Sequence, residues 1–184
     1  MRTIDGAEGE GGGQLVRTAV ALAAISGETL ELHNIRMRRT PPGLAPQHVT
    51  AVQAVAALCD AEVEGLRARS PALRFRPGRL RGGHYRFDVG TAGSLTLVLQ
   101  AVMPVAVMCD APVNLVLTGG TDVRAAPPLD YLRYVFLPLL AQAGVNATLT
   151  LRRRGYYPRG GGEIEVQVQP GRPRPIHLTQ PRPV

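Results

Sequence analysis

The sequence predicts an α/β (α+β) protein made of two tandem βαβαββ units, in each of which a helix pair packs on a small four-stranded sheet. The same order of strands, helices and turns occurs twice, with matching elements offset by roughly 80 residues. The chain has 184 residues, 45% of them hydrophobic, which is enough for one sizeable core or two small fused units. We expect the units to span 1–90 and 91–170, followed by a Pro/Arg-rich tail at 171–184.

The first unit begins with a short strand and a glycine-rich loop that leads into an apolar helix. This helix is expected to run from about Gly13 to Ser26, because Gly27 supplies a closing residue. A basic, proline-bearing loop precedes the second helix. Periodicity predicts these elements: a strand at 2–5, a helix at 13–26, a strand at 29–35, a helix at 46–59, and strands at 61–65, 73–76 and 85–89.

The second unit repeats this order after the segment GTAGS at 90–94. The predicted elements are a helix to about 108, a strand at 113–118, a helix at 129–143, and strands at 146–151 and 163–169. The most apolar window, 95–117, is interrupted by Gln100, Pro104, Asp110 and Pro112. It therefore predicts a buried helix and a strand, and no membrane is expected as a partner.

Charge and composition restrict the function classes. The net charge of +7 and an isoelectric point near 10.4 indicate an acidic partner such as nucleic acid or a nucleotide, or alternatively a basic surface that only maintains solubility. All 21 cationic side chains are arginine, which excludes a P-loop and a lysine–nucleotide adduct. Cys59 and Cys109 are expected to be packed thiols, and the N-terminus carries no signal-peptide pattern, so a cytoplasmic location is expected.

The glycine-rich loop at 6–13 is the first candidate binding site. Free amides at a helix start bind phosphate, and Gln14 and Arg17 are expected to share the helix face beside them. Glu10 then suits a metal ion next to that phosphate, because hard cations prefer oxygen ligands. The alternative is a solvated helix face, with Glu8 as a turn residue.

A second group of polar residues surrounds the start of the second helix. Arg36, Arg38 and Arg39 lie in the loop before it, and a cluster of guanidiniums is able to hold a terminal phosphate. Gln47 and His48 lie in the first helical turn. A solvated charge run and a capping histidine are the alternatives.

Gln100 interrupts an otherwise apolar helix. Burying its amide without a partner would cost roughly 1–3 kcal/mol. The side chain is therefore expected either to find a backbone partner or to face a pocket, and we favour the pocket.

Five segments together resemble the RNA 3′-terminal phosphate cyclase family. These are DGAEGEGGGQLVR, IRMRRTPPGLAPQH, GTAGSLTLVLQ, GGTDVRAAPP and RRGYYPRGGG, in order and with suitable spacing over residues 3–170. The resemblance implies an enzyme that uses ATP and a divalent metal (Mg or Mn) to convert an RNA 3′-phosphate to a 2′,3′-cyclic phosphate. It also implies histidine–AMP and RNA–adenylate intermediates, and a fold of three repeats with a small inserted domain.

The resemblance assigns roles to the candidate residues. It implies that Glu10 lies on the metal side of the ATP phosphates, that Gln14 and Arg17 line the same site, that Gln100 contacts the nucleotide, and that Pro127 lies against the adenine.

For the RNA end, the resemblance implies that Arg36 and Arg39 hold phosphate or RNA. Gln47 and His48 match the Gln–His pair of the family's active site.

In this family the adenylylated histidine belongs to the third repeat of a longer chain. None of His33, His48, His84 and His177 matches it, so the sequence is expected to be the N-terminal part of a cyclase, inactive alone. Its expected partners are RNA with a 3′-phosphate end and the missing C-terminal half, or a second copy bound through an exposed flank. The alternatives are a non-catalytic cyclase-like scaffold for RNA or ribosome assembly, and an enzyme similar to the enolpyruvyl transferases.

Overall fold

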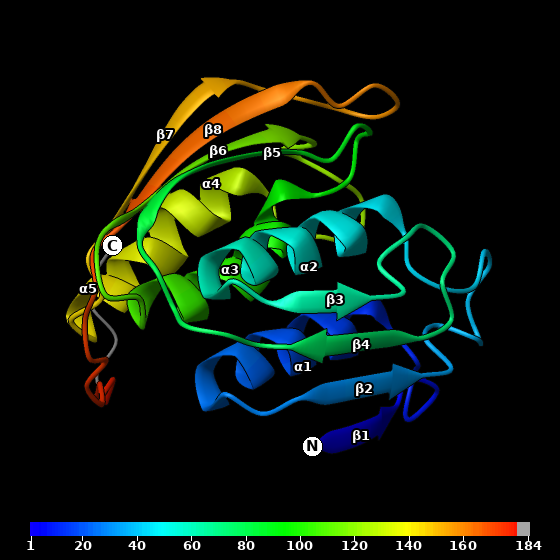
Figure 1. The fold of residues 1–184 in the computed structure, drawn as a ribbon. Helices are drawn as coiled ribbons and strands as arrows, with labels where there is room; N and C mark the ends of the chain where they lie inside the picture. The colour runs from blue at the N-terminus through cyan, green and yellow to red at the C-terminus, as the bar shows by residue number, and fades with distance from the viewer. Residues whose placement is uncertain (180–184) are drawn as a thin grey trace.

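A computed structural model describes residues 1–179. Two four-stranded mixed sheets lie on opposite sides of the molecule, and the helices fill the space between them (Figure 1). The inner face of each sheet is therefore covered by helices, and the outer face is open.

The first unit has the strand order β1-β2-β4-β3. Its elements are β1 (Arg2–Asp5), α1 (Gly13–Ser26), β2 (Leu30–His33), α2 (Pro46–Cys59), β3 (Glu62–Glu64) and β4 (Leu73–Arg76). β1 and β2 are parallel and connected through α1, whereas β4 runs antiparallel to both of its neighbours. α2 connects the parallel pair to the antiparallel pair.

The second unit repeats this arrangement with the order β5-β6-β8-β7. Its elements are β5 (Gly83–Asp88), α3 (Leu95–Val107), β6 (Val113–Gly119), the helical segments α4 (Leu129–Tyr131), η1 (Leu132–Phe136) and α5 (Leu137–Gln142), then β7 (Ala147–Arg153) and β8 (Gly162–Val168). β5 and β6 are parallel, and β8 is antiparallel to β6 and β7. The expected fold class, with helix pairs on two small mixed sheets, is confirmed.

One strand belongs to a different sheet from the one expected. The strand near 85–89 is expected in the first unit, but β5 pairs along its whole length with β6. That assignment is wrong, because a period of two identifies a strand without identifying its partner. The turn at 77–82 carries the chain across to the second sheet, and α3 then provides the crossover that a parallel pair needs.

The helix ends follow from local chemistry. α1 ends at Gly27, whose φ of 71° lies in the left-handed region that glycine adopts without strain. α3 begins after Ser94, whose hydroxyl accepts a hydrogen bond from the Leu97 N–H.

The helix expected at 129–143 contains a π-helical turn. Leu137 N–H donates to the carbonyl of Leu132, five residues back, and Pro138 follows with no N–H to donate. The helix therefore widens one turn before the proline, which periodicity alone does not reveal.

The core is continuous across both units. α1, α2 and α3 contact one another, and α2 also contacts β5. Cys59 and Cys109 are both buried, and burial raises the pKa of each thiol to about 11. Within residues 1–179, no helix combines the length and the apolar character needed to cross a bilayer.

Candidate functional site

The N-termini of α1, α2 and α3 meet at one end of the molecule (Figure 1). His48, in the first turn of α2, lies so close to Gly13 at the start of α1 that a Cβ there would collide with its Nε2 atom. Gln47 Oε1 accepts a hydrogen bond of 2.9 Å from the N–H of Ser94, just before α3. Three helix dipoles therefore direct positive potential and free amides at the same region, which we call the three-helix centre, and such a region favours anions.

Arg17 and Gln100 connect α1 with α3 beside this centre. Arg17 is only 6% exposed, and its Nε and Nη2 atoms donate to Gln100 Oε1 at 3.2 and 3.0 Å. Burial lowers the pKa of Arg17 from its ordinary value. Gln100 itself is exposed, so its amide oxygen is held while its NH₂ group is available to a ligand.

The loop that carries Arg36, Arg38 and Arg39 contacts the glycine-rich loop at 6–13. Arg39 Nη2 lies 3.3 Å from Glu10 Oε2, and Arg38 Nη1 donates to the carbonyl of Gly9 at 3.3 Å. Arg36 behaves differently, because its Nη1 donates to the carbonyl oxygens of Pro41 and Gly43 at 3.2 and 2.7 Å. Arg36 therefore stabilises the conformation of its own loop through Nη1, and the rest of its guanidinium is available to a ligand.

Burial, followed by repulsion from Arg39, lowers the pKa of Arg36. Arg36 is thus partly desolvated, whereas Arg38 and Arg39 are exposed. A partly desolvated cation attracts an anionic ligand more strongly than an exposed one.

His48 is a neutral hydrogen-bond acceptor in this structure. It is 3% exposed, and its Nδ1 atom accepts a hydrogen bond of 3.0 Å from the N–H of Ala45. Burial, then repulsion from Arg36 and Arg17, lowers the pKa of His48 to about 4. Near neutral pH the ring therefore carries its proton on Nε2, the atom that faces Gly13.

The His48 environment predicts a loss of stability in mild acid. The folded-state pKa of about 4 lies below the ordinary value of 6.5, so the unfolded chain binds the proton more readily. The contribution of neutral His48 to the free energy of unfolding is fully present above pH 6.5. It decreases by about 3 kcal/mol in total as the pH falls toward 4. Urea unfolding of wild type and His48→Asn at several pH values measures this, and an equal pH dependence in the two proteins would contradict it. Asparagine keeps an acceptor for Ala45 but does not titrate.

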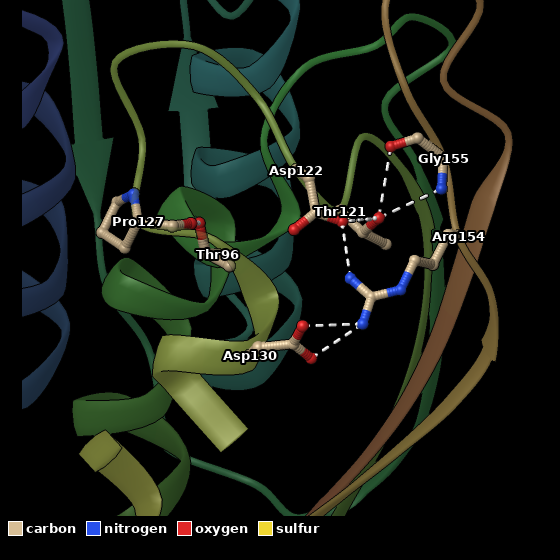
Figure 2. A network of polar contacts seen from close by, with 7 residues as sticks. All are labelled: Thr96, Thr121, Asp122, Pro127, Asp130, Arg154 and Gly155. Atoms are coloured by element: carbon tan, nitrogen blue, oxygen red, sulfur yellow. Dashed lines mark hydrogen bonds and ion pairs between the residues drawn. The ribbon is translucent and has the colours of Figure 1, made fainter. Parts of the chain in front are cut away.

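Beside the three-helix centre, a hollow of about 270 Å³ lies between α3 and α4, and its lining is mainly apolar. Gln100, Pro127 and Tyr131 line it together with Thr96 and Met103. Thr96 Oγ1 donates to the Pro127 carbonyl at 2.8 Å, which connects the loop that carries Pro127 to α3 (Figure 2). Gln100 thus faces both this hollow and Arg17.

An Arg154 network holds the loop that carries Pro127. Arg154 Nη2 donates to both carboxylate oxygens of Asp130 at 2.8 Å, and its Nη1 donates to Asp122 at 2.9 Å (Figure 2). The Thr121 hydroxyl lies 2.8 Å from Asp122 and accepts a hydrogen bond from the Gly155 N–H. The bond to Asp130, followed by that to Asp122, raises the pKa of Arg154. Sequence reasoning missed this network, whose only local signal was the arginine run at 152–154.

The structure does not bring every candidate together. Gln14 was expected to share a face with Arg17, but it is exposed and lies in a surface hollow with Glu8 and Glu10 while Arg17 is buried against α3. Both residues lie on the regular helix α1, where Gln14 lies near Glu10 and Arg17 donates to Gln100.

Among residues 1–179, no three His, Cys, Asp or Glu side chains gather as a metal site. The Glu10 side chain is 92% exposed. One carboxylate fits a magnesium-type ion only when phosphate oxygens and water supply the other ligands.

Two repeated βαβαββ units with a polar site at their junction define the class of the protein as an α/β repeat protein. The sequence model of the RNA 3′-terminal phosphate cyclase family matches residues 8–179, and the chain belongs to this family. The resemblance inferred from the five segments is thereby confirmed.

Curated relatives agree with the family. The protein named RNA 3′-terminal phosphate cyclase from Nitrosospira multiformis is 60% identical over 97% of this chain and 51% of its own length. Proteins of the same name from Ralstonia nicotianae and Ignicoccus hospitalis are each 52% identical, over 96% and 92% of this chain and 52% and 48% of their own lengths. The chain thus spans about half the length of the curated relatives it matches. A solved EPSP synthase from Acinetobacter baumannii aligns over 91% of this chain and 47% of its own, with a TM-score of 0.39 and 8% identity, too low to support an argument.

Proposed function

We propose that this chain carries the nucleotide-binding and RNA-end-binding part of an enzyme that uses ATP to convert an RNA 3′-terminal phosphate to a 2′,3′-cyclic phosphodiester. One observation carries the proposal. The Arg17–Gln100 pair connects the apolar hollow at Pro127 with the three-helix centre, so one elongated ligand is able to occupy both. A flat base in the hollow and phosphates at the helix N-termini match the two ends of ATP.

The residues divide into two groups under this proposal. Pro127 and Tyr131 flank the base, and the Gln100 NH₂ group donates to it. Arg17 and the helix amides bind phosphate oxygens.

A divalent metal such as Mg or Mn would be held by Glu10 together with phosphate oxygens and water, and it would neutralise phosphate charge. Arg39, now paired with Glu10, would then be free for the RNA 3′-phosphate. Because Nδ1 of His48 accepts from the Ala45 N–H, its Nε2 proton would be donated to a ligand oxygen, and Gln47 fixes the start of α3.

The proposed reaction proceeds through histidine–AMP and RNA–adenylate. The RNA 3′-phosphate displaces the histidine from AMP, and the neighbouring 2′-hydroxyl then attacks that phosphate and expels AMP. The adenylylated histidine is proposed to come from the remaining half of the longer relatives, since the four histidines within residues 1–179 are unsuited.

A docking surface for that half is proposed along α1 and β1. Ile4, Ala19, Leu22 and Ile25 line an apolar hollow of about 330 Å³ there, and the Leu22 side chain is 59% exposed. β1 is also the edge strand of its sheet, so its outer side offers free backbone groups. The match covers 51% of the Nitrosospira multiformis relative. The remaining half of such a relative is the proposed occupant of this surface.

Replacing Gln100 by leucine is expected to weaken ATP binding at least roughly tenfold, and also to lower the melting temperature, because it removes the acceptor of the buried Arg17 guanidinium. Isothermal titration with ATP and thermal unfolding measure the two effects. Gln53→Leu, an exposed glutamine on α2, is the matched control and should bind like wild type. Equal ATP affinity in wild type and Gln100→Leu would reject the proposed nucleotide site.

A further inference from the structure

The hairpin that joins β7 to β8 presents aromatic and cationic side chains to solvent. Tyr156 and Tyr157 are 55% and 84% exposed, and Arg159 is exposed beside them. Adjacent exposed rings of this size on a surface turn indicate an interaction site. The segment 152–162 contains four arginines and no carboxylate, and two of these arginines, Arg152 and Arg154, pair with carboxylates of other segments.

The hairpin is held in one conformation from its root to its tip. The Arg154 network anchors the root, where Gly155 is buried (Figure 2). Further along, the N–H of Gly160 donates to the carbonyl of Tyr156 at 2.8 Å, and Arg153 Nε donates to the carbonyl of Gly161 at 2.8 Å. The rings are therefore displayed on a pre-ordered turn, which reduces the entropy lost on binding.

The hairpin also borders the proposed catalytic region. Gly160 packs so closely on the backbone of Thr91 and Ala92 that a Cβ would not fit between them. That loop leads directly to Ser94, whose N–H is bonded to Gln47 at the three-helix centre. An RNA strand whose 3′ end lies at the three-helix centre would pass the hairpin within a few nucleotides of that end.

We propose that Tyr156 and Tyr157 form a stacking platform for the bases of single-stranded RNA just upstream of the 3′-terminal phosphate, with Arg159 contacting the RNA backbone. The inference rests on the proposed function, since it takes the RNA end to lie at the three-helix centre. Aromatic side chains bind unstacked bases through their π-faces and are tolerant of sequence, and arginine adds a phosphate contact.

The charge distribution favours RNA over a protein surface as the occupant. Arg154 is neutralised by Asp122 and Asp130, and Arg152 lies 2.7 Å from Glu165. Arg159 stands at the tip next to two rings, so a cation and aromatic faces are presented together. An anionic chain that carries flat bases complements both features.

The test measures fluorescence anisotropy of a short labelled single-stranded RNA, with either a 3′-phosphate or a 3′-hydroxyl, titrated with the chain. The double variant Tyr156→Ala/Tyr157→Ala is expected to bind both RNAs about tenfold more weakly or worse, because stacking does not depend on the end group. Tyr156→Phe/Tyr157→Phe keeps the rings and should bind like wild type. Tyr134→Ala, a 64% exposed tyrosine on η1, is the matched control and should have no effect.

The outcomes separate the platform from the proposed function. Arg39→Ala is expected to weaken binding of the 3′-phosphate RNA but not of the 3′-hydroxyl RNA. If Arg39→Ala has no effect, the RNA-end site is contradicted. Weaker binding by the double alanine variant would still support the platform in that case. Wild-type affinity of the double alanine variant for both RNAs would overturn the platform and leave the proposed function intact. The platform is also overturned if that variant binds RNA normally but no longer associates with the remaining half of the protein. Absence of any RNA binding by the wild-type chain would overturn both.

Discussion

Incubated alone with radiolabelled ATP and magnesium, the chain is expected to take up no covalent AMP. A histidine nucleophile needs an unprotonated ring nitrogen that faces the nucleotide phosphate. His48 is the one histidine of residues 1–179 at the three-helix centre, but its Nδ1 atom is occupied by the Ala45 N–H and its Nε2 atom carries the proton. His33 and His84 are exposed on β2 and β5, on the sheet faces turned away from the helices, and His177 lies beyond β8.

The companion experiment adds a separately expressed polypeptide that corresponds to the remaining half of the Nitrosospira multiformis relative. We then expect acid-labile, base-stable labelling, the stability of a histidine phosphoramidate, and we expect Arg17→Ala to abolish it. Labelling of the isolated chain that disappears in His48→Asn would contradict the hydrogen-bond assignment of His48. No labelling in either experiment would favour the non-catalytic scaffold alternative.

Replacing Gly13 by alanine is expected to destabilise the fold by roughly 1–3 kcal/mol, since an added methyl group overpacks a filled site. The new Cβ would collide with the His48 ring, which is buried and held by Ala45 and therefore has no free rotamer to adopt. Thermal unfolding should record a fall of roughly 3–10 °C for a chain of this size.

Gly12→Ala is the matched control for stability. The nearest atoms to a Cβ at Gly12 are 3.9 Å away or more, so Gly12→Ala changes only the N-cap residue of α1 and should lower the melting temperature less than Gly13→Ala. Combining Gly13→Ala with His48→Ala should restore part of the loss, because the second change removes the ring that the first one strikes. Strict additivity of the two changes would argue against the contact.

The sequence was sufficient for the elements whose ends depend on local chemistry. α1 and α2 begin and end at the expected residues, where Gly27 supplies the closing conformation and Pro46 suits a first turn. It was insufficient where two distant segments meet. The partner of Gln100 is Arg17, 83 positions earlier, and no periodicity connects them.

The same limit explains the other differences. Helical spacing placed Gln14 beside Arg17, but the packing of α3 against α1 decides which of the two is buried. The Arg154 network joins three segments that are adjacent only after the second sheet has formed. Pairing of β5 likewise depends on topology, since its alternating pattern suits either sheet.

The repeated strand order determines what each part would retain if the chain were divided between the two units. A cut in the turn at 77–82 would leave each four-stranded sheet with all of its own strands. The same cut would part Gln47 from Ser94 and Arg17 from Gln100, so each fragment would retain a sheet and half of a site. Neither unit contains the site by itself, because the site exists only where the two units pack together.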